Sequence, residues 1–170
     1  MTDYIDPFAP KNTGRSAFGK DKPVGYTITG VLLKDPEMVQ QRNLDDNTPE
    51  TWDDGSPKMQ AVVQLQTTLD EGAGDDGTPD DGVRTLWAKG GKATGPKGER
   101  SMQEAIRAAG ITAGAPIRKG GTLTVRYAHE ADPVKRGYNG QKLYLAKYLP
   151  PVAVDPFGEP VKVADTSELI

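Results

Sequence analysis

The sequence predicts an all-β protein with one short helix. Five runs alternate apolar and polar residues as strands do, and one helical pattern lies between the third and fourth runs. The runs cover residues 24–34, 59–68, 83–89, 122–128 and 142–149, and the helical pattern covers 101–109. The 20 glycines and 14 prolines among 170 residues, with 35% hydrophobic residues, indicate a modest core and long loops. A five-stranded barrel whose only helix lies between strands three and four is the OB-fold, which is the architecture we expect.

The first two runs have one apolar face each. In the first, Ile28 and Leu32 share a face with Gly30, and a glycine inside a strand predicts a sharp bend of the kind that small barrels need. In the second, Val63 and Leu65 share a face, while glutamines dominate the other. Both runs therefore predict strands that bury one side.

The helical pattern begins at a capping box. Ser101 and Glu104 have the spacing at which the serine hydroxyl and the glutamate carboxylate each accept a backbone N–H from the other residue. Met102, Ala105, Ile106 and Ala109 follow at helical spacing and form an apolar stripe, and Gly110 is expected to end the helix.

The last three runs combine aliphatic residues with rings and cations. Leu86 and Ala88 are expected in the core, as are Leu123, Val125 and Tyr127 of the fourth run and Leu143 and Leu145 of the fifth. Trp87, Tyr144 and Tyr148 are each out of phase with the leucines of their own run. We therefore expect these three rings on the outer face of the barrel.

The chain divides into three regions. Residues 1–23 are rich in proline and glycine and predict a loosely held N-terminal arm, residues 24–150 hold the barrel, and residues 151–170 predict an extended C-terminal tail. The connection over residues 35–58 is unusually long, so it is functional, mobile or contains a short helix.

Composition excludes several classes of site. The absence of cysteine rules out disulfides and thiolate sites, and a single histidine, His129, rules out a histidine-rich metal centre. No apolar run is long enough to cross a membrane and no secretory signal is visible, which predicts a cytoplasmic protein. Paired carboxylates lie in flexible Gly/Pro-rich segments, so we expect no catalytic site, no metal and no cofactor.

Charge is strongly segregated along the chain, although the formal net charge is only −3. Residues 45–83 contain eleven acidic residues and one lysine, a net charge of −10. Residues 84–147 contain thirteen lysines and arginines and four acidic residues, a net charge of +9. Because local fields steer a polyanion, this second region favours a nucleic-acid partner.

Aromatic rings beside cations and amides are typical of single-strand binding, in which bases stack on rings and cations neutralise phosphates. The outer positions of the predicted strands and the loop between the last two runs supply both kinds of residue. The candidate nucleic-acid-binding residues are Trp52, Trp87, Lys89, Arg126, Lys135, Arg136, Tyr138, Lys142, Tyr144 and Tyr148. Arg84, Lys92 and Lys97 are further candidate cations.

The chain resembles a group of single-stranded-DNA-binding proteins encoded by phages of actinobacteria. The resemblance spans residues 24–150 and is carried by the segments 25–31, 52–57, 62–67, 120–125 and 142–148. It implies an OB-type fold, sequence-tolerant binding of single-stranded DNA, and a role in phage DNA replication or recombination in the host cytoplasm. Cellular proteins of this class end in an acidic tail with an Asp-Pro-Phe-like tip that recruits partners, whereas here Asp155-Pro156-Phe157 lies further from the chain end.

The expected function is therefore non-enzymatic binding of single-stranded DNA, with the C-terminal tail as a candidate site for replication or recombination proteins and with self-association left open. Two rival hypotheses remain. One is a phage virion structural or decoration protein with a β-barrel core, because long arms and two-sided charge also serve assembly. The other is a small hydrolase or Ca²⁺-binding module.

Overall fold

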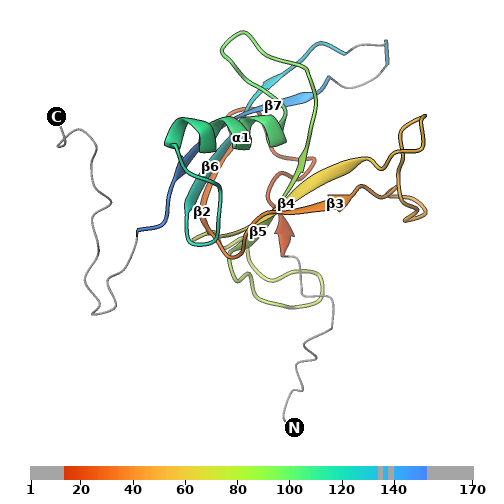
Figure 1. Ribbon diagram of the computed structural model, residues 1–170. Coiled ribbons are helices and arrows are strands. Elements are labelled where there is room, and N and C mark those ends of the chain that lie inside the picture. The colour runs from red at the N-terminus through yellow and green to blue at the C-terminus, as the bar shows by residue number, and fades with distance from the viewer. Residues whose placement is uncertain (1–13, 134–135, 138–139, 153–170) are drawn as a thin grey trace, which may run out of the picture.

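The computed structural model describes residues 14–133, 136–137 and 140–152. Within them the protein is mainly β with one helix, as predicted, and its strands form one seven-stranded mixed sheet (Figure 1). The strands are β1 (Arg15–Ser16), β2 (Thr27–Leu32), β3 (Glu37–Gln40), β4 (Met59–Gln66), β5 (Val83–Lys89), β6 (Thr122–Glu130) and β7 (Lys142–Leu149), and the helix is α1 (Met102–Ala113). All five expected strands are present, and β1 and β3 are additional.

The sheet has the order β1-β5-β4-β2-β6-β7, with β3 also paired to β4. Only the β1–β5 pair is parallel. The sheet is not closed into a barrel by hydrogen bonds, which corrects the prediction of a closed five-stranded barrel. At each of the two strands that would have to meet, another segment pairs with part of the edge. β1 pairs with the free edge of β5, and Arg100 exchanges two backbone hydrogen bonds with Tyr144 of β7.

Part of the expected N-terminal arm belongs to the sheet. After β1, Ala17 donates its backbone N–H to Thr85 and is buried. The Phe18 ring then packs edge-on against Tyr26 and Tyr144, at centroid distances of 5.7 and 5.2 Å. The prediction of a loose arm is therefore wrong for residues 14–18, whereas residues 1–13 lie outside the described residues.

The long connection over residues 35–58 contains a strand, β3, instead of a short helix. β3 pairs with β4 from Glu37↔Val62 to Gln40↔Met59, and isolated bridges continue this pairing along the connection. Residues 37–62 therefore form a hairpin, here called the β3–β4 arm, which extends away from α1 (Figure 1).

The inward faces of the strands form the core, which α1 covers on one side. The apolar stripe of the helix is buried as predicted, and Ser101 caps its first turn by accepting a hydrogen bond from the Glu104 amide. The helix continues past Gly110 and ends at Gly114, whose φ of 68° is the left-handed conformation that glycine adopts without strain. At Gly30 a Cβ would lie 2.7 Å from the Gln66 carbonyl oxygen, so glycine here permits the close crossing of β2 and β4.

The predicted faces are confirmed for β2, β5 and β6. In β7 Leu143 is buried as predicted, but the prediction is wrong for the other leucine and for the two tyrosines. Tyr144 and Tyr148 point into the core, whereas Leu145 is 38% exposed. Both tyrosines find partners inside. The Tyr144 ring lies 5.6 Å from that of Tyr127, and the Tyr148 hydroxyl accepts a hydrogen bond from the Arg118 amide.

Among the described residues, no helix combines the length and the apolar character that a membrane-spanning segment needs.

Candidate nucleic-acid interface

A pocket of about 210 Å³ lies where β5 ends and β7 begins, beside the first turn of α1. We call it the β5–β7 pocket. It is lined by Trp87, Lys89, Ser101, Met102, Gln141, Lys142 and Tyr144. Four predicted binding residues, from strands more than fifty positions apart in the sequence, therefore surround one hollow.

Trp87 and Lys89 face outward because their neighbours Leu86 and Ala88 fill the core. The Trp87 side chain is 39% exposed, which is unusual for the largest apolar ring. Trp87 lies opposite Val62, and Lys89 lies opposite Gln60, whose side-chain oxygen is buried without a hydrogen-bond partner. The outer face of β5 thus offers a ring and a cation side by side, whereas the amide of Gln60 is buried.

The opposite wall of the β5–β7 pocket is held rigidly. The Lys142 ammonium lies 5.2 Å from the centre of the Tyr127 ring, a cation–π contact that directs the lysine head along β7. Tyr144 is fixed between Phe18 and Tyr127, and burial raises its pKa to about 12. Tyr144 therefore stays neutral and acts as a wall of the pocket, while its ring face is covered by other side chains.

The remaining predicted residues are spread over other parts of the molecule. Arg126 is exposed on the outer face of β6, where its Nε donates to Thr27 Oγ1 over 3.1 Å. Trp52 is 57% exposed in the β3–β4 arm, with the Lys58 ammonium 4.9 Å from its ring. Arg136 is exposed in the loop between β6 and β7. Lys135 and Tyr138 lie outside the described residues, and Tyr148 is in the core.

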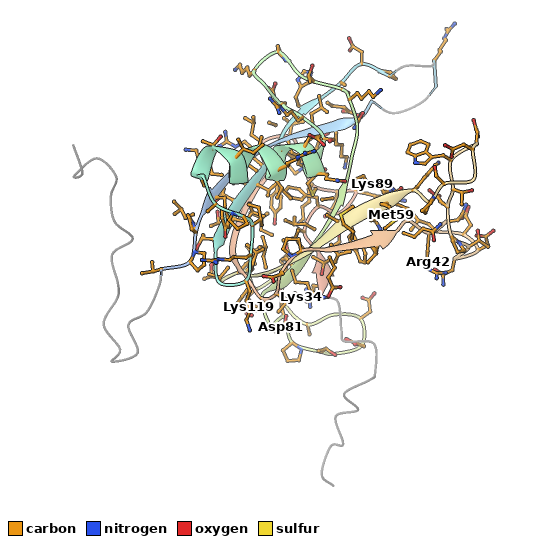
Figure 2. All side chains as sticks on the ribbon, viewed as in Figure 1. Lys34, Arg42, Met59, Asp81, Lys89 and Lys119 are labelled. Atoms are coloured by element: carbon orange, nitrogen blue, oxygen red, sulfur yellow. The ribbon has the colours of Figure 1, made fainter. Side chains whose placement is uncertain are left out.

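The acidic loop over residues 70–82 lies at the far end of the β4–β5 pair. The register pairs Gln66 with Val83 beside this loop and Gln60 with Lys89 beside the β5–β7 pocket. Figure 2 shows the same separation, with Lys89 and Met59 at one end and Asp81 at the other. The carboxylates of this loop therefore do not line the pocket.

Ion pairs hold the acidic loop against the rest of the protein. Arg84, a further candidate cation for phosphate, is buried and binds Asp80 through two hydrogen bonds of 2.8 and 2.6 Å. Arg15 and Lys22 of the N-terminal segment contact Asp80 and Glu71 at 3.6 and 2.8 Å. Arg84 is thus committed to the fold and is not available to a phosphate.

Sequence reasoning missed Ser101, Met102 and Gln141 as lining residues. Ser101 and Met102 were assigned to the helix start alone, and no pattern in the sequence placed that start between β5 and β7. The backbone pairing of Arg100 with Tyr144 is what brings it there.

Comparisons with protein-family models, with curated proteins and with solved structures found no match. Among the described residues, no group of three or more histidine or carboxylate side chains is arranged to hold a metal ion. The chemistry offered by the β5–β7 pocket is therefore that of its own side chains: a stacking surface, two ammonium groups and amide hydrogen-bonding groups.

Proposed function

We propose that this protein binds single-stranded DNA without strong sequence preference and without catalysis. The observation that carries the proposal is the half-exposed Trp87 indole beside Lys89 and Lys142 at the β5–β7 pocket. A base would stack on the indole while the two ammonium groups neutralise the adjacent phosphates. The resemblance to phage proteins supports a role in DNA replication or recombination in the host cytoplasm.

The sheet topology supports an OB-type fold for this protein. When β1 and β3 are set aside, the remaining strands have the order β5-β4-β2-β6-β7, so the first expected strand pairs with the second and the fourth. In OB-folds the second and third strands form the binding face, and two loops flank it. The corresponding elements here are β4 and β5, the β3–β4 arm, and the loop between β6 and β7.

Within this proposal the two core tyrosines of β7 are packing residues, and the stacking surface is Trp87. Arg126, Arg136 and Trp52 are candidate contacts along a longer path. Lys135 and Tyr138 keep the roles predicted from sequence. Recruitment of replication or recombination proteins by the C-terminal tail stays a prediction, and so does self-association.

Fluorescence titration with oligo-dT tests the proposal, because Trp52 and Trp87 are the only tryptophans. We expect quenching on binding at low salt. Loss of one stacked base costs about 1–3 kcal/mol, so Trp87→Ala should weaken affinity roughly 5- to 150-fold. The matched control is Ile111→Ala, which truncates an apolar side chain that is 74% exposed on α1, outside the β5–β7 pocket. Absence of binding by the parent protein, or an unchanged affinity for Trp87→Ala, would contradict the mechanism.

The β3–β4 arm supports the second candidate function, a phage virion structural or decoration protein. Leu44, Trp52 and Met38 are 95%, 57% and 53% exposed on it, and such apolar exposure suits a protein contact. Finding the protein at stoichiometric amounts in purified particles, together with no affinity for oligo-dT, would favour this candidate over DNA binding.

A further inference from the structure

A second hollow, the α1–β7 groove, has a volume of about 560 Å³ and is distinct from the β5–β7 pocket. One wall is the small-residue side of α1, which includes Ala105, Ala108, Ala109 and Ala113. The other wall is β7 from Tyr144 to Leu149. Alanines leave room for incoming side chains along the full length of an edge strand.

Among the described residues, none pairs with the outer edge of β7 beyond Tyr144, so this edge presents backbone groups to the groove. In antiparallel sheets the N–H and C=O of successive residues point to alternate sides. The backbone hydrogen bonds of Tyr127 are directed toward the β2 side, and those of its partner Tyr144 are both made with Arg100. The paired residues Tyr127 and Tyr144 therefore do not bond to each other, so the backbone groups of residues 145, 147 and 149 are the ones that point toward β6. Ala146 and Tyr148 therefore direct their backbone groups to the outer edge, where the described part of the chain places no further strand.

Such an edge can accept an extended peptide by strand addition. The Arg100–Tyr144 bridge already begins this pairing, and the chain then turns away into α1. The next two pairing positions along β7 are the vacant ones.

We propose that the C-terminal segment 161–164 of the same chain occupies the α1–β7 groove as an added antiparallel strand on β7. Its sequence, Val-Lys-Val-Ala, alternates β-branched and other residues as a half-buried strand does. Four residues paired antiparallel with this part of β7 would complete the backbone hydrogen bonds of Ala146 and Tyr148.

Length fits this occupant, and the acidic residues that flank the segment on both sides complement the groove, while the segment itself carries Lys162. The groove carries the cations Arg100 and Lys147, whereas residues 153–170 contain four acidic residues and one lysine. The linking residues 150–160 can extend to roughly 36 Å, whereas six residues of a strand cover about 20 Å. The segment therefore reaches any position on its own β7.

Amide hydrogen exchange followed by NMR tests the proposal on the full chain and on a chain that ends at Val152. We expect the Ala146 and Tyr148 amides to exchange at least tenfold faster in the shortened chain. The Leu145 and Lys147 amides, which bond to β6, should be unchanged and serve as internal controls. Equal exchange of Ala146 and Tyr148 in the two chains would overturn the proposal.

A pair of proline variants places the contact within the tail. Because adjacent strand residues point their N–H groups to opposite sides, the double change Lys162→Pro and Val163→Pro removes a donor toward β7 in either register. We expect it to reproduce the effect of shortening, whereas Ala153→Pro with Val154→Pro should not. Protection that rises with protein concentration would instead assign the groove to the tail of a second copy, and would overturn occupancy by the same chain.

Discussion

Among single residues, Arg84 and Asp80 make the largest electrostatic contribution that the structure defines. The guanidinium is 2% exposed and the carboxylate fully buried, and the two side chains form a bidentate pair. A buried charge that loses its partner is costly, because neither water nor another ion replaces it. We therefore expect a neutral isostere at position 80 to lower the stability of the whole fold.

Acid stability should depend on this pair. The Arg84 guanidinium and the backbone amides of Glu71 and Gly82 hold the pKa of Asp80 well below its usual range. As the pH falls, Asp80 is protonated in the unfolded chain before it is protonated in the folded protein. The contribution of ionised Asp80 to folding stability is therefore complete above about pH 4 and is lost as the pH falls below it. We expect Asp80→Asn to lower the urea midpoint at pH 7 and to flatten its decline between pH 5 and pH 3. Asp75→Asn, an exposed change in the same loop, should leave both unchanged.

Gly30 is the second residue whose replacement should affect stability. A methyl group there would lie 2.7 Å from the Gln66 carbonyl oxygen and 2.9 Å from the Leu65 Cβ, so β2 and β4 would have to separate. We expect Gly30→Ala to cost about 1–3 kcal/mol in chemical denaturation. The matched control is Gly90→Ala, where only the flexible Gln103 side chain is near, and where a loss of more than ~0.5 kcal/mol would be unexpected.

Among the elements, β1 and the residues after it have a structural role that the sequence did not predict. The Phe18 ring packs against Tyr26, which precedes β2, and against Tyr144 of β7. Phe18 therefore links the start of β2 to β7. We expect Phe18→Ala to lower stability by about 1–3 kcal/mol in thermal or urea unfolding. Val24→Ala, which truncates a side chain that is 55% exposed, should have little effect. An equal effect of the two changes would contradict a structural role for this segment.

The sequence could predict the elements better than the contacts between them. Alternation located β2, β4, β5, β6 and β7 because each buries one face, and the capping serine located the start of α1. The short strands β1 and β3 carry no periodic signal, and they form only because β5 and β4 offer them free edges.

β7 shows why the faces themselves were harder to predict. Leucines and tyrosines alternate along it, so either set could be buried. The structure buries Leu143 but leaves Leu145 exposed. It buries both tyrosines because Tyr127 and Phe18 offer ring contacts, and because Gly121 leaves room for the Tyr148 ring. The pocket residues Trp87, Lys89 and Lys142 could be predicted individually. Their meeting around α1 could not, since it depends on the bridge between Arg100 and Tyr144.

For the whole molecule, the segregation of charge along the sequence becomes a separation in space for one of the two acidic segments, the loop over residues 70–82. The loop over residues 70–82 holds much of the acidic charge at one end of β4 and β5, partly neutralised by Arg15, Lys22 and Arg84. The β5–β7 pocket and the exposed Lys92 and Lys97 lie beyond the other end of β5. The acidic residues of the β3–β4 arm lie at this same end of β4, so an approaching polyanion meets the cations of the pocket beside a second acidic segment.

The salt dependence of binding should report this arrangement. For single strands, log K falls with log salt by about 0.7 for each neutralised phosphate. We expect the joint change Lys89→Ala and Lys142→Ala to reduce the slope measured with oligo-dT by about 1.4, which corresponds to two lost phosphate contacts. Lys147→Ala, which removes an exposed cation outside the β5–β7 pocket, is the control. A slope that the double variant shares with the parent protein would contradict phosphate contacts at these lysines.

The central position of β2 has a consequence for biosynthesis. β2 emerges from the ribosome early, yet its longest pairing, from Thr27↔Arg126 to Val31↔Thr122, joins it to a strand made almost a hundred residues later. Until then β4 and β5 can form their hairpin, but β2 has one edge unpaired. Its outward residues are two threonines and one valine, which makes this waiting strand a weak template for aggregation. Pairing of this edge of β2 is therefore a late event in translation, because it waits for β6.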